Sequence, residues 1–511
     1  MFRKGAAQFG GQFLGIVLAL LVSHLIARRM GIGPEADALL LGRRLITAVS
    51  EMLNQVLVLV FIPVVAAQIA GGARLGRIVL RSAGPAFLLG VVLATTLFLA
   101  TPAVIGLVAP TLPNTTQALA TDVIALFVWT LPPMIATIAV SAYCNVHGVF
   151  GPTAAIRQVP RMAIILALAL GSAGAIAVTA AWAYALATWL VLIGTLGIAV
   201  IAHRGSSDVD EAPGQVPEPP AKAGLGRRGT AAIVLAIGAL VAIWLETAVA
   251  ATRGTGAITL LDFAQRIGAL LGNTLATALG LVVFADMSRR FAQGRIDTLG
   301  PSFRRAVTIG FAAIVPVTTA VILNAGAIVE LLLGYGRFAH SDGREDIVLL
   351  IQLMAVAPIG ALILRMMLAR IIAEDGLPVV RLIGSVVVVD LLGRIGLFAT
   401  LVPSVGLIGI PIALILSPIL PIVMLGTWLS ARGTFSGSIH KGQLGPVAAL
   451  SGLTALSISV GVATASAVSG GIAGKTLAAL QLTMSGGFGL LTLAVSAFVL
   501  RARLRSALTA W

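Results

Sequence analysis

The stretch from Gly84 to Val108 reads GPAFLLGVVLATTLFLATPAVIGLV and contains no charged side chain. A run of about 20 apolar residues is long enough to cross the hydrocarbon core of a bilayer. Backbone amides in lipid must find their partners within the protein, so such a run predicts a helix. Similar runs recur along the whole chain in blocks rather than in alternation, which disfavours a membrane β-barrel.

The composition excludes a soluble globule. Apolar residues make up 58% of the 511 residues and charged residues only 10%, whereas soluble domains carry about 25% charged residues. The net charge of +15 does not indicate nucleic-acid binding, because the basic residues form short clusters between apolar runs, as they do in membrane proteins. Cys144 is the only cysteine, so no disulfide framework is expected.

The runs predict an all-α polytopic membrane protein with about fourteen transmembrane helices. The expected spans are 8–27, 38–68, 79–108, 121–145, 157–178, 181–202, 229–250, 259–285, 304–333, 346–372, 379–402, 407–429, 445–467 and 478–500. With the N-terminus placed inside, most of the 34 lysine and arginine residues, Arg157 and Arg161 among them, fall on inner loops and tails. This asymmetry predicts that both termini are cytoplasmic.

A polar linker and a weak internal repeat suggest the domain organisation. Residues 203–228 are rich in proline and acidic residues, which predicts a disordered cytoplasmic linker. Residues 44–68 (RLITAVSEMLNQVLVLVFIPVVAAQ) weakly resemble residues 266–290 (RIGALLGNTLATALGLVVFADMSRR). Such a parallel repeat is typical of transporters. We therefore expect two six-helix bundles, 1–202 and 229–430, and two further helices in 431–511.

Charged residues at bilayer depth are costly, so they are candidates for function. The candidates for a substrate cavity between the bundles are Asp37, Arg44, Glu51, Asp262, Arg266, Asn273 and Arg365. Guanidinium groups there would bind an anionic group. The alternative is that acidic and basic residues four positions apart, Asp262–Arg266 and Asp390–Arg394, pair within their own helices. Spacing alone does not decide whether Arg43 or Arg44 faces the cavity.

Missing motifs restrict the energy source and the chemistry. The chain has no GxxxxGK[ST] phosphate loop, so transport is expected to run on an ion gradient, the membrane potential or the substrate gradient. The five histidines are scattered without metal-ligand spacing, so no metal site is predicted. No outer loop carries a catalytic constellation, so the chain is not expected to be an enzyme.

Four motifs resemble the MurJ/MviN family of lipid II flippases, within the multidrug/oligosaccharidyl-lipid/polysaccharide exporter superfamily. Each motif is weak alone, but their order and spacing are specific. They cover most of the chain to about residue 430 and are ARRMGIGPEADA at 27–38, LDFAQRI at 261–267, GYGRFAHSD at 334–342 and VPSVGLIG at 402–409.

The resemblance implies a bacterial inner-membrane protein with fourteen spans and two bundles that form a V and alternate in access. The implied cargo is a polyprenyl-diphosphate-linked saccharide, and the last two helices would form a groove for its lipid tail. Arg266 matches a cavity arginine that binds the diphosphate, and Asp37 matches the family's aspartate. We expect no cofactor, coupling to Na⁺ or H⁺, membrane lipids as the surroundings and a monomer.

The chain also departs from the family pattern. The family's arginine pair in span 1 aligns with Ile16 and Val22, and a further cavity arginine aligns near Ser50. The family's sodium site uses spans 7 and 11, where Glu246 and Asp390 do not align cleanly, so a cation site at these two residues is a separate prediction. The reduced positive charge predicts a divergent member, carrying either a lipid II-like cell-wall precursor or an exopolysaccharide repeat unit.

Two other classes of function remain as alternatives. An exporter of small cationic drugs from the same superfamily would favour an acidic cavity lined by aromatic residues, whereas this chain has only three tyrosines and six tryptophans. A membrane-embedded enzyme of glycan assembly would need a catalytic acid near an outer loop.

Overall fold

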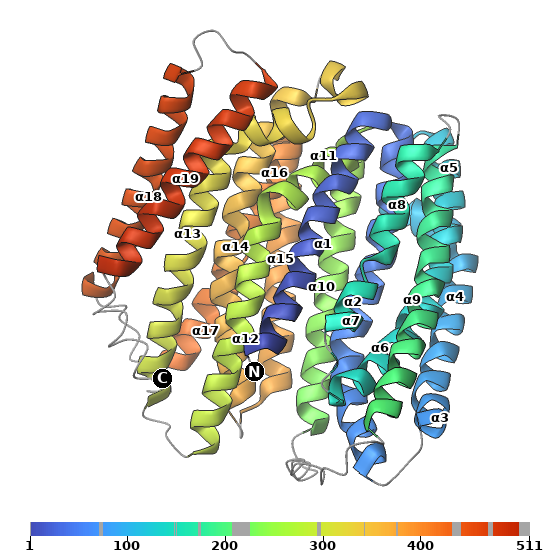
Figure 1. Cartoon of the computed structure of the whole chain (residues 1–511). Helices are drawn as coiled ribbons and strands as arrows, with labels where there is room; N and C mark the ends of the chain where they lie inside the picture. The colour runs from blue at the N-terminus through green and yellow to red at the C-terminus, as the bar shows by residue number, and fades with distance from the viewer. Residues whose placement is uncertain are drawn as a thin grey trace. The chain divides into compact units, whose positions relative to one another are not determined.

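The computed structural model describes residues 2–70, 75–147, 149, 151–171, 175–206, 225–293, 298–341, 343–374, 377–431, 441–468 and 474–499. Every regular element among these residues is a helix (Figure 1). The all-α prediction is therefore confirmed for the described residues. The cause is the one that the apolar runs imply, since a helix pairs its backbone amides within one segment.

The chain divides into two compact units, Met1–Thr259 and Leu260–Trp511. The helices of the first unit are α1 (Phe2–Arg29), α2 (Pro34–Ala70), α3 (Leu75–Ile78), α4 (Gly84–Val108), α5 (Asn114–Phe127), α6 (Leu131–Val146), α7 (Gly151–Ile156), α8 (Val159–Leu170), α9 (Ile176–Ser206) and α10 (Leu225–Ala251). The π-helix η1 (Val79–Ala83) joins α3 to α4, and the 3-10 helix η2 (Val128–Thr130) joins α5 to α6.

Helix α6 lies at the centre of the first unit and packs against α2, α4 and α9. Nearly all of its side chains from Leu131 to Cys144 are buried. Gly90 lets α4 approach closely, because a Cβ atom there would lie 2.5 Å from the Pro132 Cα of α6. Small residues at such contacts allow helices in membranes to pack backbone to backbone.

The second unit begins within α11 (Ala257–Ala264) and continues through the π-helix η3 (Gln265–Ala269). Its further helices are α12 (Leu270–Ala292), α13 (Leu299–Leu332), η5 (Gly336–His340), α14 (Arg344–Ala373), α15 (Val379–Val405), η6 (Gly406–Ile408), α16 (Gly409–Leu416), α17 (Ile419–Ala431), α18 (Lys441–Val468) and α19 (Lys475–Val499). The last two helices, red in Figure 1, pack on each other and on α13.

Eight helical segments among the described residues are long and apolar enough to cross a membrane. They are Leu75–Val108, Asn114–Val146, Gly151–Leu170, Ile176–Arg204, Gly229–Ala251, Gly300–Leu332, Arg344–Ile372 and Val379–Ala431. The chain is thus a multi-pass membrane protein. One predicted boundary is wrong: the span expected at 157–178 begins earlier and ends at Leu170, because Gly171 adopts an extended conformation that stops α8.

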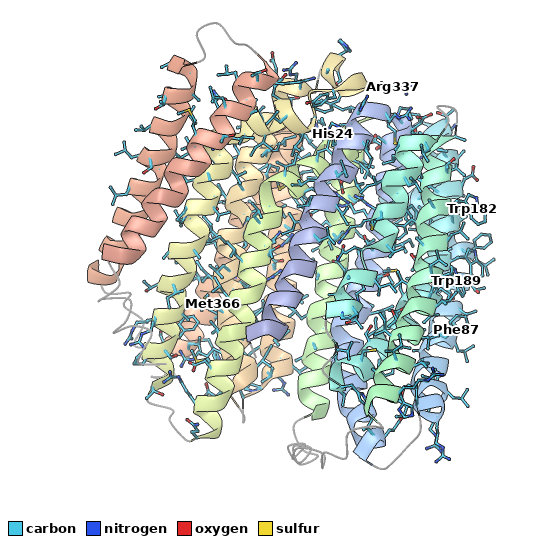
Figure 2. The ribbon with its side chains drawn as sticks, viewed as in Figure 1. His24, Phe87, Trp182, Trp189, Arg337 and Met366 are labelled. Carbon is cyan, nitrogen blue, oxygen red and sulfur yellow. The ribbon has the colours of Figure 1, made fainter. Side chains whose placement is uncertain are left out.

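The outer surface of the first unit supports membrane embedding. Large apolar side chains on α4 and α9 are exposed, including Leu99 at 74%. Aromatic rings lie among them: Phe87 and Trp189 pack edge to face with their centroids 5.9 Å apart, and Trp182 extends outward on the same helix α9 (Figure 2). So much exposed apolar surface is unusual in a soluble monomer and suits contact with lipid.

The position of the predicted linker differs from the division between the two units. Of residues 203–228, the stretch 207–224 lies outside the described residues, whereas the two ends are helical and not disordered as predicted: 203–206 belong to α9 and 225–228 to α10. Helix α10, which follows the linker, packs against α2 and α4 and belongs to the first unit. The division between the two compact units therefore falls later in the sequence than the repeat suggests.

Candidate functional site

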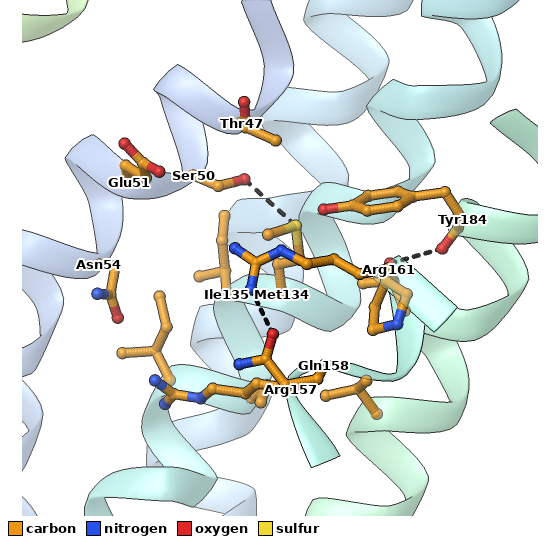
Figure 3. Close-up of a pocket in the computed structure, with 15 residues that line it drawn as sticks. Thr47, Ser50, Glu51, Asn54, Met134, Ile135, Arg157, Gln158, Arg161 and Tyr184 are labelled. Atoms are coloured by element: carbon orange, nitrogen blue, oxygen red, sulfur yellow. Dashed lines mark hydrogen bonds between the residues drawn. The ribbon is translucent and has the colours of Figure 1, made fainter. Parts of the chain in front are cut away.

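A cavity of about 390 Å³ lies within the first unit, between α2, α6, α9 and the turn that joins α7 to α8 (Figure 3). Its apolar lining includes Met134 and Ile135 of α6 and Val191 of α9. Its polar lining consists of Glu51, Asn54, Arg157, Gln158, Arg161 and Tyr184, with the hydroxyl groups of four further residues, Thr47, Ser50, Thr137 and Thr188. We call this cavity the α2–α8 pocket.

The two arginines of the α2–α8 pocket enter from the same short stretch of chain. Arg157 lies in the turn between α7 and α8, and Arg161 lies in the first turn of α8. Pro160 occupies an early position of α8, where its missing N–H costs no helical hydrogen bond. Arg161 Nη1 donates a hydrogen bond to the side-chain oxygen of Gln158, which fixes the direction of the guanidinium group.

Gly15 of α1 packs closely against Arg161. A Cβ atom at Gly15 would lie 2.8 Å from Arg161 Nη1 and 3.1 Å from Gln158 Oε1. A methyl group there would displace these side-chain ends, so α1 closes one side of the Arg161–Gln158 pair. The guanidinium group is therefore held in place by a hydrogen bond and by packing before any ligand binds.

Helix α2 supplies the opposite side of the pocket. Thr47, Ser50, Glu51 and Asn54 recur at intervals of three and four and so share one face of the helix. Ser50 donates a hydrogen bond to the sulfur of Met134 at 3.3 Å, and Glu51 keeps an exposed side chain. Figure 3 shows Glu51 and Asn54 on one side of the pocket, with the Tyr184 ring across from them.

Glu51 is thus the predicted cavity residue that the structure places in this pocket. Sequence reasoning missed Arg157, Gln158 and Arg161, because it assigned both arginines to an inner loop. That assignment is corrected: residues 151–170 form an apolar helical segment, and both arginines line the pocket inside the unit. The signal that could have found Arg161 is Pro160, because proline favours the first turn of a helix and so places Arg161 within that turn rather than before the helix.

Arg44 and Glu246 lie together in the first unit. Arg44 Nη2 is 3.2 Å from Glu246 Oε2, and both side chains are buried. The pair joins α2 to α10. Glu246, which the sequence suggests as a cation ligand, therefore faces an arginine, and the positive charge of Arg44 is balanced by a carboxylate. Arg43 is buried as well.

Asp37 is fully buried and accepts hydrogen bonds from the residues at the start of α11. Its Oδ1 accepts hydrogen bonds from the backbone N–H of Thr259 at 2.9 Å and from the Thr259 hydroxyl at 2.6 Å. Its Oδ2 accepts from the backbone N–H of Gly256, which adopts a φ of +91°. Asp37 thus caps the start of a helix and does not line the α2–α8 pocket.

In the second unit, Asp262 and Asp390 each pair with an arginine one turn along the same helix, as Asp286 does with Arg290. Arg266 Nε lies 2.6 Å from Asp262 Oδ2, and Arg394 Nε lies 2.8 Å from Asp390 Oδ2. The predicted alternative, in which these acidic and basic residues pair within their own helices, is therefore confirmed at both sites. Asn273 and Arg365 are exposed on α12 and α14, two helices that pack together.

The predicted cation site consists of one residue from each unit, Glu246 and Asp390, and each is ion-paired with an arginine. Among the described residues, no group of three or more histidine, cysteine, aspartate or glutamate side chains lies close enough to hold a metal ion.

Comparison with known proteins gives the context of these sites. A family model described as lipid II flippase MurJ matches residues 26–479. No protein with a curated description matches the chain in sequence. A solved structure of the lipid II flippase MurJ in an inward closed conformation has a TM-score of 0.71 at 14% identity, covering 99% of this chain and 100% of that chain.

Two transporters of the MOP superfamily also share the fold. An inward-facing multidrug resistance MATE family transporter has a TM-score of 0.65 at 15% identity, covering 82% of this chain and 94% of that chain. A MOP superfamily transporter from Pyrococcus furiosus has a TM-score of 0.58 at 16% identity, covering 83% and 93%. At such identities the structural likeness shows the fold alone. The family model, by contrast, spans most of the sequence, and on that evidence the chain belongs to the MurJ lipid II flippase family.

Proposed function

We propose that this protein is a flippase that moves a polyprenyl-diphosphate-linked saccharide across the bacterial inner membrane by alternating access. The observation that carries the proposal is the match of the MurJ family model to residues 26–479. The α2–α8 pocket supports it, because a polar cavity inside an apolar helical unit gives a hydrophilic headgroup a place away from lipid.

The proposal includes a finer architecture. Fourteen spans would comprise two six-helix bundles and a final pair, α18 and α19, that provides a groove for the lipid tail. Each of the fourteen stretches expected from sequence contains helical residues, which is consistent with this count. Both termini would be cytoplasmic, the protein would act as a monomer, and the movement of Na⁺ or H⁺ would drive transport without a bound cofactor.

The charge of the α2–α8 pocket disfavours the drug-exporter alternative. Its lining contains two arginines and one glutamate, so its net charge is positive. An organic cation would be repelled there, whereas a headgroup with anionic or hydroxyl groups finds donors and acceptors.

Reconstitution into liposomes tests the function directly. A lipid-linked saccharide with a labelled sugar is placed in both leaflets, and the fraction that becomes accessible to an external sugar-modifying enzyme is followed with time. We expect the protein to accelerate this exchange relative to empty liposomes. Exchange at the rate of empty liposomes, for both a lipid II-type cargo and an exopolysaccharide-type cargo, would rule the proposal out.

A further inference from the structure

We propose that the α2–α8 pocket is the subsite for a sugar ring of the cargo and that it selects a sugar carrying a carboxylate. This inference rests on the proposed function and specifies the class of substrate. It assigns Arg161 and Arg157 as the residues that bind the carboxylate, and Glu51 and Asn54 as partners of the sugar hydroxyls.

The size of the pocket suits a sugar ring. Its 390 Å³ falls at the lower end of the range of about 300–1,000 Å³ that is typical of small-molecule sites. One ring with its hydroxyl groups fits this volume, whereas a polyprenyl chain does not. The apolar lining residues Met134, Ile135 and Val191 offer contacts for the C–H groups of a ring.

The mixture of polar groups suits hydroxyls. Each sugar hydroxyl both donates and accepts, so a site for it needs acceptors as well as donors. Glu51 and the side-chain oxygen of Asn54 accept, while Arg157, Arg161 and the Asn54 amide donate. In Figure 3 the Tyr184 hydroxyl end of the ring points into the same space and can do either.

The same mixture argues against a diphosphate in this pocket. A diphosphate carries several negative charges, and the Glu51 carboxylate on the facing α2 side of the pocket would repel it more strongly than it repels a single carboxylate. A single carboxylate needs only one fixed guanidinium group, which it binds through two parallel hydrogen bonds. Arg161 is such a group, because Gln158 and Gly15 already hold it in place. Little side-chain entropy is then lost on binding.

The test uses full-length protein in an amphiphile without sugar groups, because glycosidic detergents would compete for the pocket. Saturation-transfer NMR is recorded with D-glucuronate, D-glucose and inorganic diphosphate as probes. We expect glucuronate to receive saturation from the protein, with about tenfold weaker binding of glucose, since one charged hydrogen-bond pair is missing. Diphosphate at equal concentration should leave the glucuronate signal unchanged.

Three variants locate the binding. Arg161→Gln should weaken glucuronate binding about tenfold. Gly15→Ala should also weaken it, because the added methyl displaces the flexible end of Arg161 while the backbone of α1 stays unstrained. The matched control is Arg77→Gln, which removes an exposed arginine of α3 in the same unit and should leave binding as in wild type. Thermal unfolding checks that each variant is folded.

Several results would overturn the assignment: equal binding of glucose and glucuronate, displacement of glucuronate by diphosphate, absence of glucuronate binding, or equal losses in the Arg161 and Arg77 variants. The outcome is separable from that of the proposed function. Liposome exchange of a lipid-linked saccharide without glucuronate binding would leave the flippase standing and remove the subsite. Glucuronate binding without exchange would support a site for carboxylate-bearing sugars in the pocket and rule out the flippase function.

Discussion

Arg44 on α2 and Glu246 on α10 form a buried ion pair, with Arg44 Nη2 3.2 Å from Glu246 Oε2. Each charge is sheltered from water and lies opposite its counterpart. Breaking such a pair by removing one partner leaves an uncompensated buried charge, whereas replacing both partners by apolar residues removes the problem. The pair therefore predicts strong coupling between two residues that are distant in sequence.

We expect Arg44→Met to destabilise the protein by about 3–5 kcal/mol, and Glu246→Leu by a similar amount. The double variant should recover most of that loss. Unfolding of the purified protein by heat or denaturing detergent measures all three. If the double variant loses the sum of the two single losses, the residues are not coupled and the prediction is wrong.

Replacement of Asp37 should loosen the start of α11. Asp37→Ala leaves the N–H groups of Gly256 and Thr259 without their acceptor in a buried place, at a cost of about 1–3 kcal/mol for each orphaned group. The thermal midpoint of unfolding is the measurement, and Asp37→Asn, which keeps an acceptor oxygen, should lose less. Asp122→Ala, an exposed aspartate of α5, serves as the control and should unfold as wild type does.

Two glycines of α4 should respond in opposite directions to the same change. A Cβ atom at Gly90 would meet the Pro132 backbone of α6, so Gly90→Ala should destabilise by about 1–3 kcal/mol. Gly106 has nothing within 4 Å, so Gly106→Ala should be neutral or stabilise by up to about 1 kcal/mol. Equal midpoints of thermal unfolding for the two variants would show that α4 and α6 are not in close contact.

Arg266→Ala should abolish translocation of the lipid-linked saccharide while the protein still inserts and folds. Its guanidinium group is partly accessible and pairs with Asp262 through Nε, and a guanidinium group carries further N–H donors that can bind an anionic group. Liposome exchange measures the effect. Arg290→Ala breaks a similar pair, with Asp286 at 2.7 Å on the same helix, and should retain exchange if it folds. Exchange at the wild-type rate by Arg266→Ala would remove this arginine from the transport pathway.

Composition and periodicity were enough to predict the helices. In lipid, a long apolar segment can hydrogen-bond all its backbone N–H and C=O groups within itself only as a helix. They also identified the residues whose burial needs a partner, such as Asp37 and Asp262. The i, i+4 spacing offered Arg266 as a partner for Asp262, and the structure contains that pair, but the sequence did not predict the partners of Asp37 or Arg44. Glu246 lies some two hundred positions from Arg44, and spacing along a helix predicts contacts only within that helix.

The α2–α8 pocket shows a second limit. Charge clusters near span ends predict topology on average, and this rule placed Arg157 and Arg161 in an inner loop. In the structure Arg157 lies in the turn before α8 and Arg161 in its first turn, and both side chains line the pocket together with Glu51. The C-terminal boundary of α8 was also mispredicted. The helix ends where Gly171 adopts an extended backbone conformation, and apolar composition does not indicate such a local change.

Arg266 lies in the π-helical turn η3, between two ordinary α-helical segments. A π turn contains one more residue than an α turn, so it acts as a single-residue insertion that the helix absorbs without breaking. Everything after Ala269 is rotated by about 100° relative to an uninterrupted helix. A face counted forward from Asp262 therefore misplaces Asn273. For alignment with relatives, the consequence is a one-residue gap inside this helix wherever the wide turn is missing, so that positions before and after it need separate registers.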